Sequence, residues 1–161
     1  MLNNFRVVSL SIIVAFMLTV MPLPHWAVEL RPDWVTLVLI YWAMALPARI
    51  GVTIAWLCGI MLDVSTGAIL GQHALGHVLA IYIVHTQHQR LRVASLLQQS
   101  IVVLFLLLLK QLVVLWVNGI VGRAPDTWLF FLQSPIGAMI WPWVYIIMRD
   151  LRRKFGYRVD Y

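Results

Sequence analysis

The sequence has little charge, little cysteine and no recognisable catalytic motif. Only 11% of its 161 residues are charged and 62% are hydrophobic, whereas a soluble domain has about 25% charged residues and at most about half apolar residues. A soluble core of this size could not bury so much apolar surface. The composition therefore excludes an ordinary soluble domain and indicates an all-α polytopic membrane protein. A single domain is expected, because no linker, repeat or low-complexity segment interrupts the apolar runs.

The scarcity of reactive side chains excludes most catalytic and metal sites. Cys58 is the single cysteine, so the chain can form neither an internal disulfide nor a cysteine metal cluster. The six acidic residues form no evident catalytic pair, and the motifs of serine hydrolases, P-loop proteins and zinc proteases are missing. The pairs His73–His77 and His85–His88 could each place two ligands on one helix face, but no third ligand accompanies either pair. We expect neither an enzyme nor a bound metal or other cofactor.

The basic residues follow membrane topology, so the net charge of +6 is not interpreted as a nucleic-acid surface. Six spans are predicted at residues 5–23, 32–46, 49–63, 68–85, 95–117 and 128–148, followed by a basic cytoplasmic tail at 149–161. With both termini in the cytoplasm, nine Lys and Arg residues lie inside and only Arg31 and Arg123 lie outside. The positive-inside rule favours this orientation. Trp128, Trp141 and Trp143 are expected to anchor the last span at the membrane interfaces.

Residues 30–71 carry the most local detail. A corner that starts a helix is formed by Arg31, Pro32, Asp33 and Trp34. Pro47 is expected to break that helix, which makes the second span short. A face of small residues, spaced four apart on the third span, is formed by Gly51, Ala55, Gly59 and Asp63. Such a face lets another helix approach closely, either a helix of the same chain or a partner's. In the predicted topology Asp33 and Asp63 both lie at the outer surface, where a partner could reach them.

The remaining charges have two expected roles. Lys110 lies deep within the fifth span, where a charge costs several kcal/mol. We expect it to face the bundle interior or a partner's helix, with Asp33 or Asp63 as the candidate counter-charge. Anionic lipid is expected to contact the basic residues that follow the last span, at about 1 kcal/mol for each residue near the surface. These residues are Arg149, Arg152, Arg153, Lys154 and Arg158.

Taken together, these motifs resemble the MreD family of rod shape-determining proteins, of the gammaproteobacterial type. The motifs are Leu30-Arg31-Pro32-Asp33-Trp34, Tyr41-Trp42, Ala45-Leu46-Pro47 with Arg49, Gly59-x-x-Leu62-Asp63, Gly67, Leu70-Gly71, and Trp141-Pro142-Trp143 before Met148-Arg149. Chain length, span number and the basic tail agree as well. Lys110 matches no motif of the family.

The resemblance implies a non-enzymatic inner-membrane component of the rod complex, or elongasome, which organises peptidoglycan synthesis. Its implied partners are the scaffold MreC, the MreB filament, RodZ, and RodA with its class B penicillin-binding transpeptidase. The implied fold is similar to the six-helix substrate-binding component of energy-coupling-factor transporters. We expect the transmembrane helix of MreC and its adjacent segment to dock on the first three spans, at the small-residue face and the outer corners. The alternative is a component that binds or transports a small solute or a lipid precursor.

Overall fold

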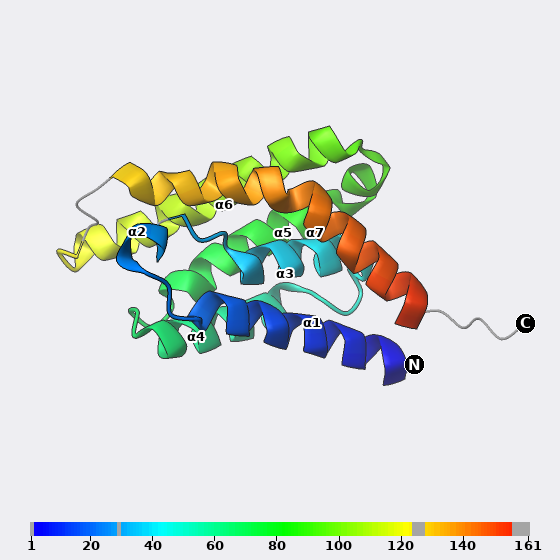
Figure 1. Ribbon diagram of the computed structural model, residues 1–161, viewed down its shortest axis with the longest axis horizontal. Helices are drawn as coiled ribbons and strands as arrows, with labels where there is room; N and C mark the ends of the chain where they lie inside the picture. Colours follow the sequence, from blue (N-terminus) through cyan, green and yellow to red (C-terminus); the bar gives the residue numbers. More distant parts are fainter. Residues whose placement is uncertain (1, 29, 124–127, 156–161) are drawn as a thin grey trace, which may run out of the picture.

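The computed structural model describes residues 2–28, 30–123 and 128–155, and within these ranges every regular element is a helix. The elements are α1 (Leu2–Val20), α2 (His25–Val28), α3 (Trp34–Ala45), α4 (Val52–Thr66), α5 (Gln72–Val93), α6 (Leu96–Ile120), the 3-10 helix η1 (Trp128–Leu132) and α7 (Gln133–Phe155). The start of α1 and the end of α7 lie at the same end of the bundle, which we call the terminal end (Figure 1).

Helix α3 is the centre of the bundle. Every residue from Val35 to Ala45 is buried, and the helix contacts α1, α5, α6 and α7. A helix that is apolar on all sides is stable only when its whole surface is covered, and α3 meets this condition with neighbouring helices. On the side of α1, the indole of Trp42 donates a hydrogen bond to the Ser11 hydroxyl at 2.8 Å. The short segment predicted as the second span is thus the core helix.

The two ends of α3 are set by the residues that flank it. The Asp33 side chain accepts a hydrogen bond from the backbone N–H of Thr36 at 3.2 Å, as an N-cap does. At the other end Leu46 is the C-cap, because the residue before a proline is pushed out of the helical conformation. The predicted break at Pro47 is confirmed.

Helix α4 packs closely on α5 through the predicted small-residue face. Ala55 and Asp63 have 0% exposure, and Gly59 is buried too. A Cβ atom at Gly59 would lie 2.6 Å from the backbone nitrogen of Ala74 on α5, whereas one at Gly51 would have nothing within 4 Å. The face therefore packs on a helix of the same chain, and Gly51 serves instead as the N-cap of α4.

The later helices differ from the prediction in length. Helix α5 begins at Gln72, after Gly71 in the left-handed conformation with φ 95°, and it continues through the polar stretch to Val93. The fourth span was predicted to end at residue 85, and the polar stretch after it is a largely exposed extension of the same helix. Helix α7 likewise continues to Phe155 with Pro142 inside it. The expected anchor role of Trp141 is wrong, since its side chain is buried and donates to Gln99 at 3.2 Å.

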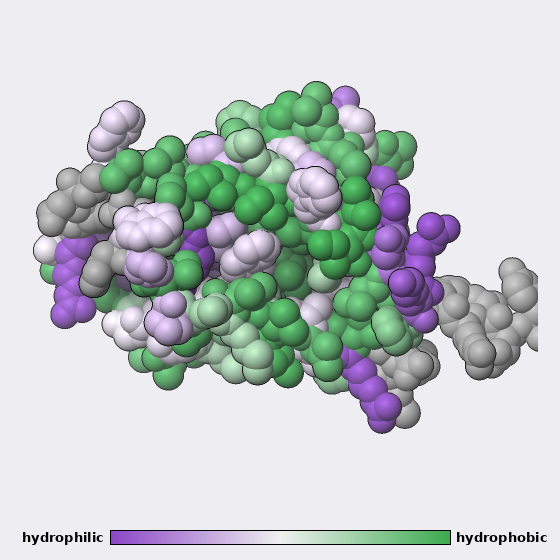
Figure 2. All heavy atoms as spheres, viewed as in Figure 1, coloured by the Kyte–Doolittle hydropathy of each residue, from purple (hydrophilic) through white to green (hydrophobic). Residues whose placement is uncertain are grey.

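The outer surface of the bundle is suited to a membrane. Figure 2 shows hydrophobic side chains over the middle of the molecule and hydrophilic ones gathered at its two ends. Two segments, Leu96–Ile120 and Trp128–Phe155, are long and apolar enough to cross a membrane, and three shorter helices are apolar as well. Helix α5 has sufficient length, but its glutamines and histidines lower its hydropathy. Six complete crossings stay a prediction.

The close contact between α4 and α5 predicts that adding one methyl group at Gly59 strongly lowers the stability of the protein. Gly59→Ala places a Cβ against the Ala74 backbone, which cannot move aside as a side chain can. Overpacking of this kind costs about 1–3 kcal/mol. We expect a lower unfolding temperature in detergent, followed with a thiol-reactive dye, because Cys58 is the only cysteine and is buried. The control is Gly119→Ala near the end of α6, where a Cβ meets nothing within 4 Å. Equal effects of the two substitutions would contradict the packing described.

Candidate functional site

Four buried polar side chains meet at the end of the bundle opposite to the terminal end. We call Asp33, Thr36, His77 and Lys110 the polar cluster. The ammonium of Lys110 donates to the Asp33 carboxylate, to Thr36 Oγ1 at 2.8 Å and to His77 Nε2 at 3.0 Å. All four residues are buried, with Thr36 and His77 at 0% exposure. The cluster joins α6, through Lys110, to the start of the central helix α3 and to α5.

The protonation of the cluster follows from its donors and acceptors. An ammonium has three protons and no acceptor capacity, and three acceptors surround Lys110 Nζ. His77 Nε2 faces the ammonium as an acceptor and also lies 2.9 Å from Thr36 Oγ1, while its Nδ1 is buried with no hydrogen-bond partner among the described residues. Because Asp33 and Lys110 carry opposite charges, the cluster has no net charge. The network satisfies all three protons of the ammonium internally.

A glycine makes room for the lysine. A Cβ atom at Gly76 on α5 would lie 2.6 Å from Cγ of Lys110, so the stem of the lysine runs over the place where another residue would have its side chain. Gly76 lies one position before His77. Gly76 leaves space for the stem of the lysine, and His77 contacts its ammonium. Sequence reasoning missed both roles, because glycine and histidine have many uses in a helix and nothing in the spacing selects this one.

Asp63 forms a second buried site beside the cluster. Its carboxylate accepts the backbone N–H of Gly71 at 2.8 Å and that of His73 at 2.9 Å, and it contacts His73 Nδ1 at 2.8 Å. These donors lie at the start of α5, where the helix dipole favours a negative charge. Asp63, at the end of α4, therefore fixes the turn between α4 and α5.

A third network joins α6 to the start of α7. Gln111, next to Lys110, donates to the carbonyl of Phe130 at 2.8 Å and to Gln133 Oε1 at 3.1 Å. Ser134 donates to Gln111 Oε1 at 2.5 Å. The sequence marked Gln111 only as a polar interruption of an apolar helix. It offered no signal for Ser134 or Thr36, which look like ordinary small residues in apolar segments.

A small cavity touches all three networks. Its volume is about 80 Å³, whereas pockets for small molecules measure about 300–1,000 Å³. Its lining residues are Thr19, Asp33, Leu62, Thr66, His73, Lys110, Gln111, Val114, Phe130 and Gln133. A water molecule takes about 30 Å³ in the liquid, so the space suits a few waters. The polar side chains at this end therefore contact mainly one another.

The corner residues hold the fold together. The Arg31 guanidinium donates to the backbone carbonyls of Thr19 and Met21 at the end of α1. Pro32 and Trp34 are half-buried. The expected surface location of Asp33 and Asp63 is wrong, because their exposure is 7% and 0%. Each carboxylate is turned inward toward internal donors, since a charge in an apolar medium needs them. Partner binding through the corner or the small-residue face stays a prediction.

The histidines expected to be possible ligands have other contacts. His73 contacts Asp63, and His77 contacts Thr36 within the polar cluster. His88 contacts the His85 carbonyl at 2.7 Å. Within residues 2–28, 30–123 and 128–155, no three His, Cys, Asp or Glu side chains are arranged to hold a metal ion.

The basic residues after the last span begin as part of α7. Arg149 pairs with Asp150 at 3.6 Å, and Arg153 and Lys154 are exposed. Arg152 lines a pocket at the terminal end. Arg158 lies outside the described residues.

An apolar groove runs between α1 and α4, and we call it the α1/α4 groove. Its volume is about 790 Å³, and it is lined by Ile13, Val14, Phe16, Met17, Leu18, Val20, Met21, Pro22, Met61 and Ser65. Met17 and Met61 are both more than half exposed. The groove is the largest of the hollows described here, and its lining is almost wholly apolar.

The ion pair predicts that a single substitution lowers the thermal stability far more than a double substitution that removes both charges. Lys110→Met leaves the buried Asp33 carboxylate without a counter-charge, and breaking a buried pair costs about 3–5 kcal/mol. Adding Asp33→Asn removes the orphaned charge and keeps an oxygen for the cap on Thr36. We expect the double variant to recover much of the lost thermal stability, measured by exposure of Cys58. Lys154→Met, at the exposed end of α7, is the control. A double variant no more stable than Lys110→Met alone would contradict this account.

Comparison with known proteins identifies the family. Residues 1–151 match the family model described as rod shape-determining protein MreD. The rod shape-determining protein MreD of Haemophilus influenzae is 33% identical over 153 residues, which cover 95% of this chain and 94% of that protein. No solved structure matches the chain. The match spans the central helix, the polar cluster and the groove alike. The chain therefore belongs to the MreD family of rod shape-determining membrane proteins.

Proposed function

We propose that this chain acts in rod shape determination as a non-enzymatic component of the bacterial inner membrane, which binds MreC and helps to organise peptidoglycan synthesis. The observation that carries the proposal is the family match over residues 1–151. The polar side chains fit a role without catalysis, because Lys110, Asp33 and Asp63 are committed to internal partners. MreB, RodZ, RodA and the transpeptidase are further proposed partners in the same complex.

We propose the α1/α4 groove as the docking site for the transmembrane helix of MreC. Helices associate in lipid mainly through van der Waals packing along matching surfaces. The groove offers an apolar channel between two helices, lined by flexible methionine and branched side chains. It also belongs to the first and third predicted spans, where docking was expected. The buried small-residue face of α4 packs on α5 and is not part of the groove.

The proposed topology has six crossings with both termini in the cytoplasm. It is supported by the common location of the start of α1 and the end of α7 (Figure 1) and by the excess of basic residues on that side. The short helices α3 and α4 then need thinner bilayer or protein cover, and α3 has protein cover on all sides. Likeness to the substrate-binding component of energy-coupling-factor transporters stays part of this proposal.

The alternative, binding of a small solute, has less support at the polar cluster. A cavity of about 80 Å³ is below the size of small-molecule pockets. Binding of a lipid precursor would need a larger polar pocket, and the terminal end has one of about 370 Å³.

The groove can be tested by photo-crosslinking in cells. A photoreactive residue at Met17 or Met61 is expected to give an adduct with MreC. The control is the same residue at Trp116 of α6, which is 67% exposed and lies toward the same end of the bundle. Each variant is first tested for restoring rod shape to cells that lack the chain, so that only folded protein is compared.

Two outcomes would contradict the docking site. Adducts with MreC at Trp116 but not at Met17 or Met61 would move the contact to another face. Adducts of equal yield at all three positions would show collision in the membrane without docking.

A further inference from the structure

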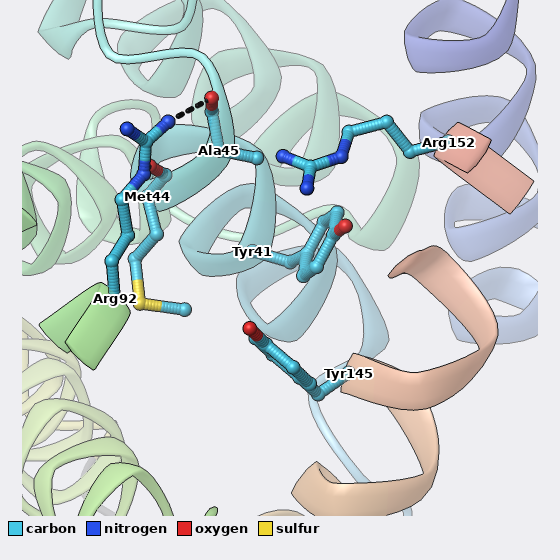
Figure 3. A pocket seen from close by; sticks show the side chains of 6 residues that line it. All are labelled: Tyr41, Met44, Ala45, Arg92, Tyr145 and Arg152. Carbon is cyan, nitrogen blue, oxygen red and sulfur yellow. Dashed lines mark hydrogen bonds between the residues drawn. The ribbon is translucent and has the colours of Figure 1, made fainter. Parts of the chain in front are cut away.

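The terminal end holds a polar pocket that the proposed function does not use. Its volume is about 370 Å³, which falls within the range of ligand pockets. We call it the terminal pocket, and it is lined by Tyr41, Met44, Ala45, Arg92, Tyr145 and Arg152. Figure 3 shows the side chains from α3, α5 and α7 around the pocket, with Arg152 next to Tyr41 and Arg92 beside Met44 and Ala45.

The hydroxyl of Tyr41 is the most informative group in the pocket. Tyr41 is 2% exposed, and its hydroxyl has no hydrogen-bond partner within the described residues. Buried polar groups are nearly always paired, and leaving one unpaired is costly. An orphaned hydroxyl that faces a polar pocket indicates a partner supplied from outside the chain. Because a tyrosyl hydroxyl donates readily, an acceptor is the natural partner.

The two arginines add positive charge without a lining carboxylate. Arg92 donates from Nε to the Met44 carbonyl at 2.6 Å and from Nη2 to the Ala45 carbonyl, so its guanidinium is held in place by the end of α3. Arg152 forms no ion pair with the acidic side chains of the described residues. The nearby Asp150 is paired with Arg149. The pocket thus offers fixed N–H and O–H donors and two positive charges, which is the chemistry that binds phosphate.

The position of the pocket indicates where such a phosphate would come from. On α7, the apolar side chains of Trp143 and Ile147 are exposed, and Arg152 and the exposed Arg153 and Lys154 follow within two turns of Ile147. This change from apolar to basic surface is typical of the level at which lipid headgroups lie. A phosphate at this level would be joined to acyl chains that lie along the apolar surface of the bundle.

We infer that the terminal pocket binds the phosphate headgroup of an anionic membrane lipid. The phosphate oxygens accept hydrogen bonds from Tyr41, Tyr145 and the guanidiniums of Arg92 and Arg152. This binding is separate from partner docking in the α1/α4 groove, which lies on other helices. The same phosphate chemistry could come from inorganic phosphate, so the experiment compares the two sources.

The test counts bound lipid on the full chain by native mass spectrometry. The probes are dioleoyl phosphatidic acid, dioleoyl phosphatidylcholine and inorganic phosphate. We expect one phosphatidic acid to bind tightly and phosphatidylcholine to bind at least tenfold more weakly. Arg152→Gln should weaken phosphatidic acid binding about tenfold, the loss expected for a hydrogen bond to a charged group. The control is Arg153→Gln, which removes the same charge from a neighbouring residue that does not line the pocket. It should have little effect on phosphatidic acid binding.

A second variant separates binding from folding. Tyr41→Phe removes only the orphaned hydroxyl, so the lipid-free protein should unfold at the same or a higher temperature while binding weakens several-fold. Equal losses for Arg152→Gln and Arg153→Gln would overturn the proposal in favour of general attraction to basic residues. Unchanged binding in Tyr41→Phe would overturn it too. If inorganic phosphate displaced phosphatidic acid at equal concentration, the proposal that the bound phosphate belongs to a lipid would be overturned.

Discussion

The ion pair between Lys110 and Asp33 is the interaction that the rest of the structure depends on. It joins the buried lysine of α6 to the residue that caps the central helix, and it brings α3, α5 and α6 to one point. Burying two charges is expensive, and their attraction repays the cost only when further hydrogen bonds complete the set. Thr36 and His77 provide those bonds, and Gly76 provides the space. The pair therefore restricts the arrangement of helices to the one in which all these groups meet.

The two ends of the bundle differ in the space that is left among their polar groups. At the end with Lys110, the ammonium and the two carboxylates have internal partners and the remaining cavity is small, although His77 Nδ1 and Arg31 Nε are buried there with no hydrogen-bond partner in the described part of the chain. At the terminal end, the pocket is larger, its lining carries two guanidiniums, and the Tyr41 hydroxyl has no partner in the described part of the chain. The first end has room for a few waters, and the second has room for a ligand. The apolar flank between them, with the α1/α4 groove, is the surface on which a membrane partner can pack.

The sequence predicted the class of fold well and the site less well. Composition alone indicated membrane helices, and Pro47 located the end of α3. The regular spacing of Ala55, Gly59 and Asp63 predicted a packing face, although spacing cannot say which helix covers it. The inward direction of Asp33 and Asp63 was missed, since a charged residue at a predicted corner looks exposed until its partner is known. Lys110 lies 77 residues from Asp33, and no local pattern connects positions so far apart. Gly76, Thr36 and Ser134 gave no signal, because their roles depend on which neighbours the tertiary fold supplies.

The position of α3 also bears on how the chain is made. This helix is about 18 Å long by its 12 residues, too short to cross the hydrocarbon layer of about 30 Å alone, and it begins at a carboxylate. While the ribosome has produced only the first half of the chain, Asp33 has no counter-charge and α3 has no cover from α6 or α7. The central helix can settle only after Lys110 has been synthesised and inserted. Assembly therefore waits for the second half of the protein, and a product truncated before α6 lacks both the counter-charge of Asp33 and the cover that α6 and α7 give to the core helix.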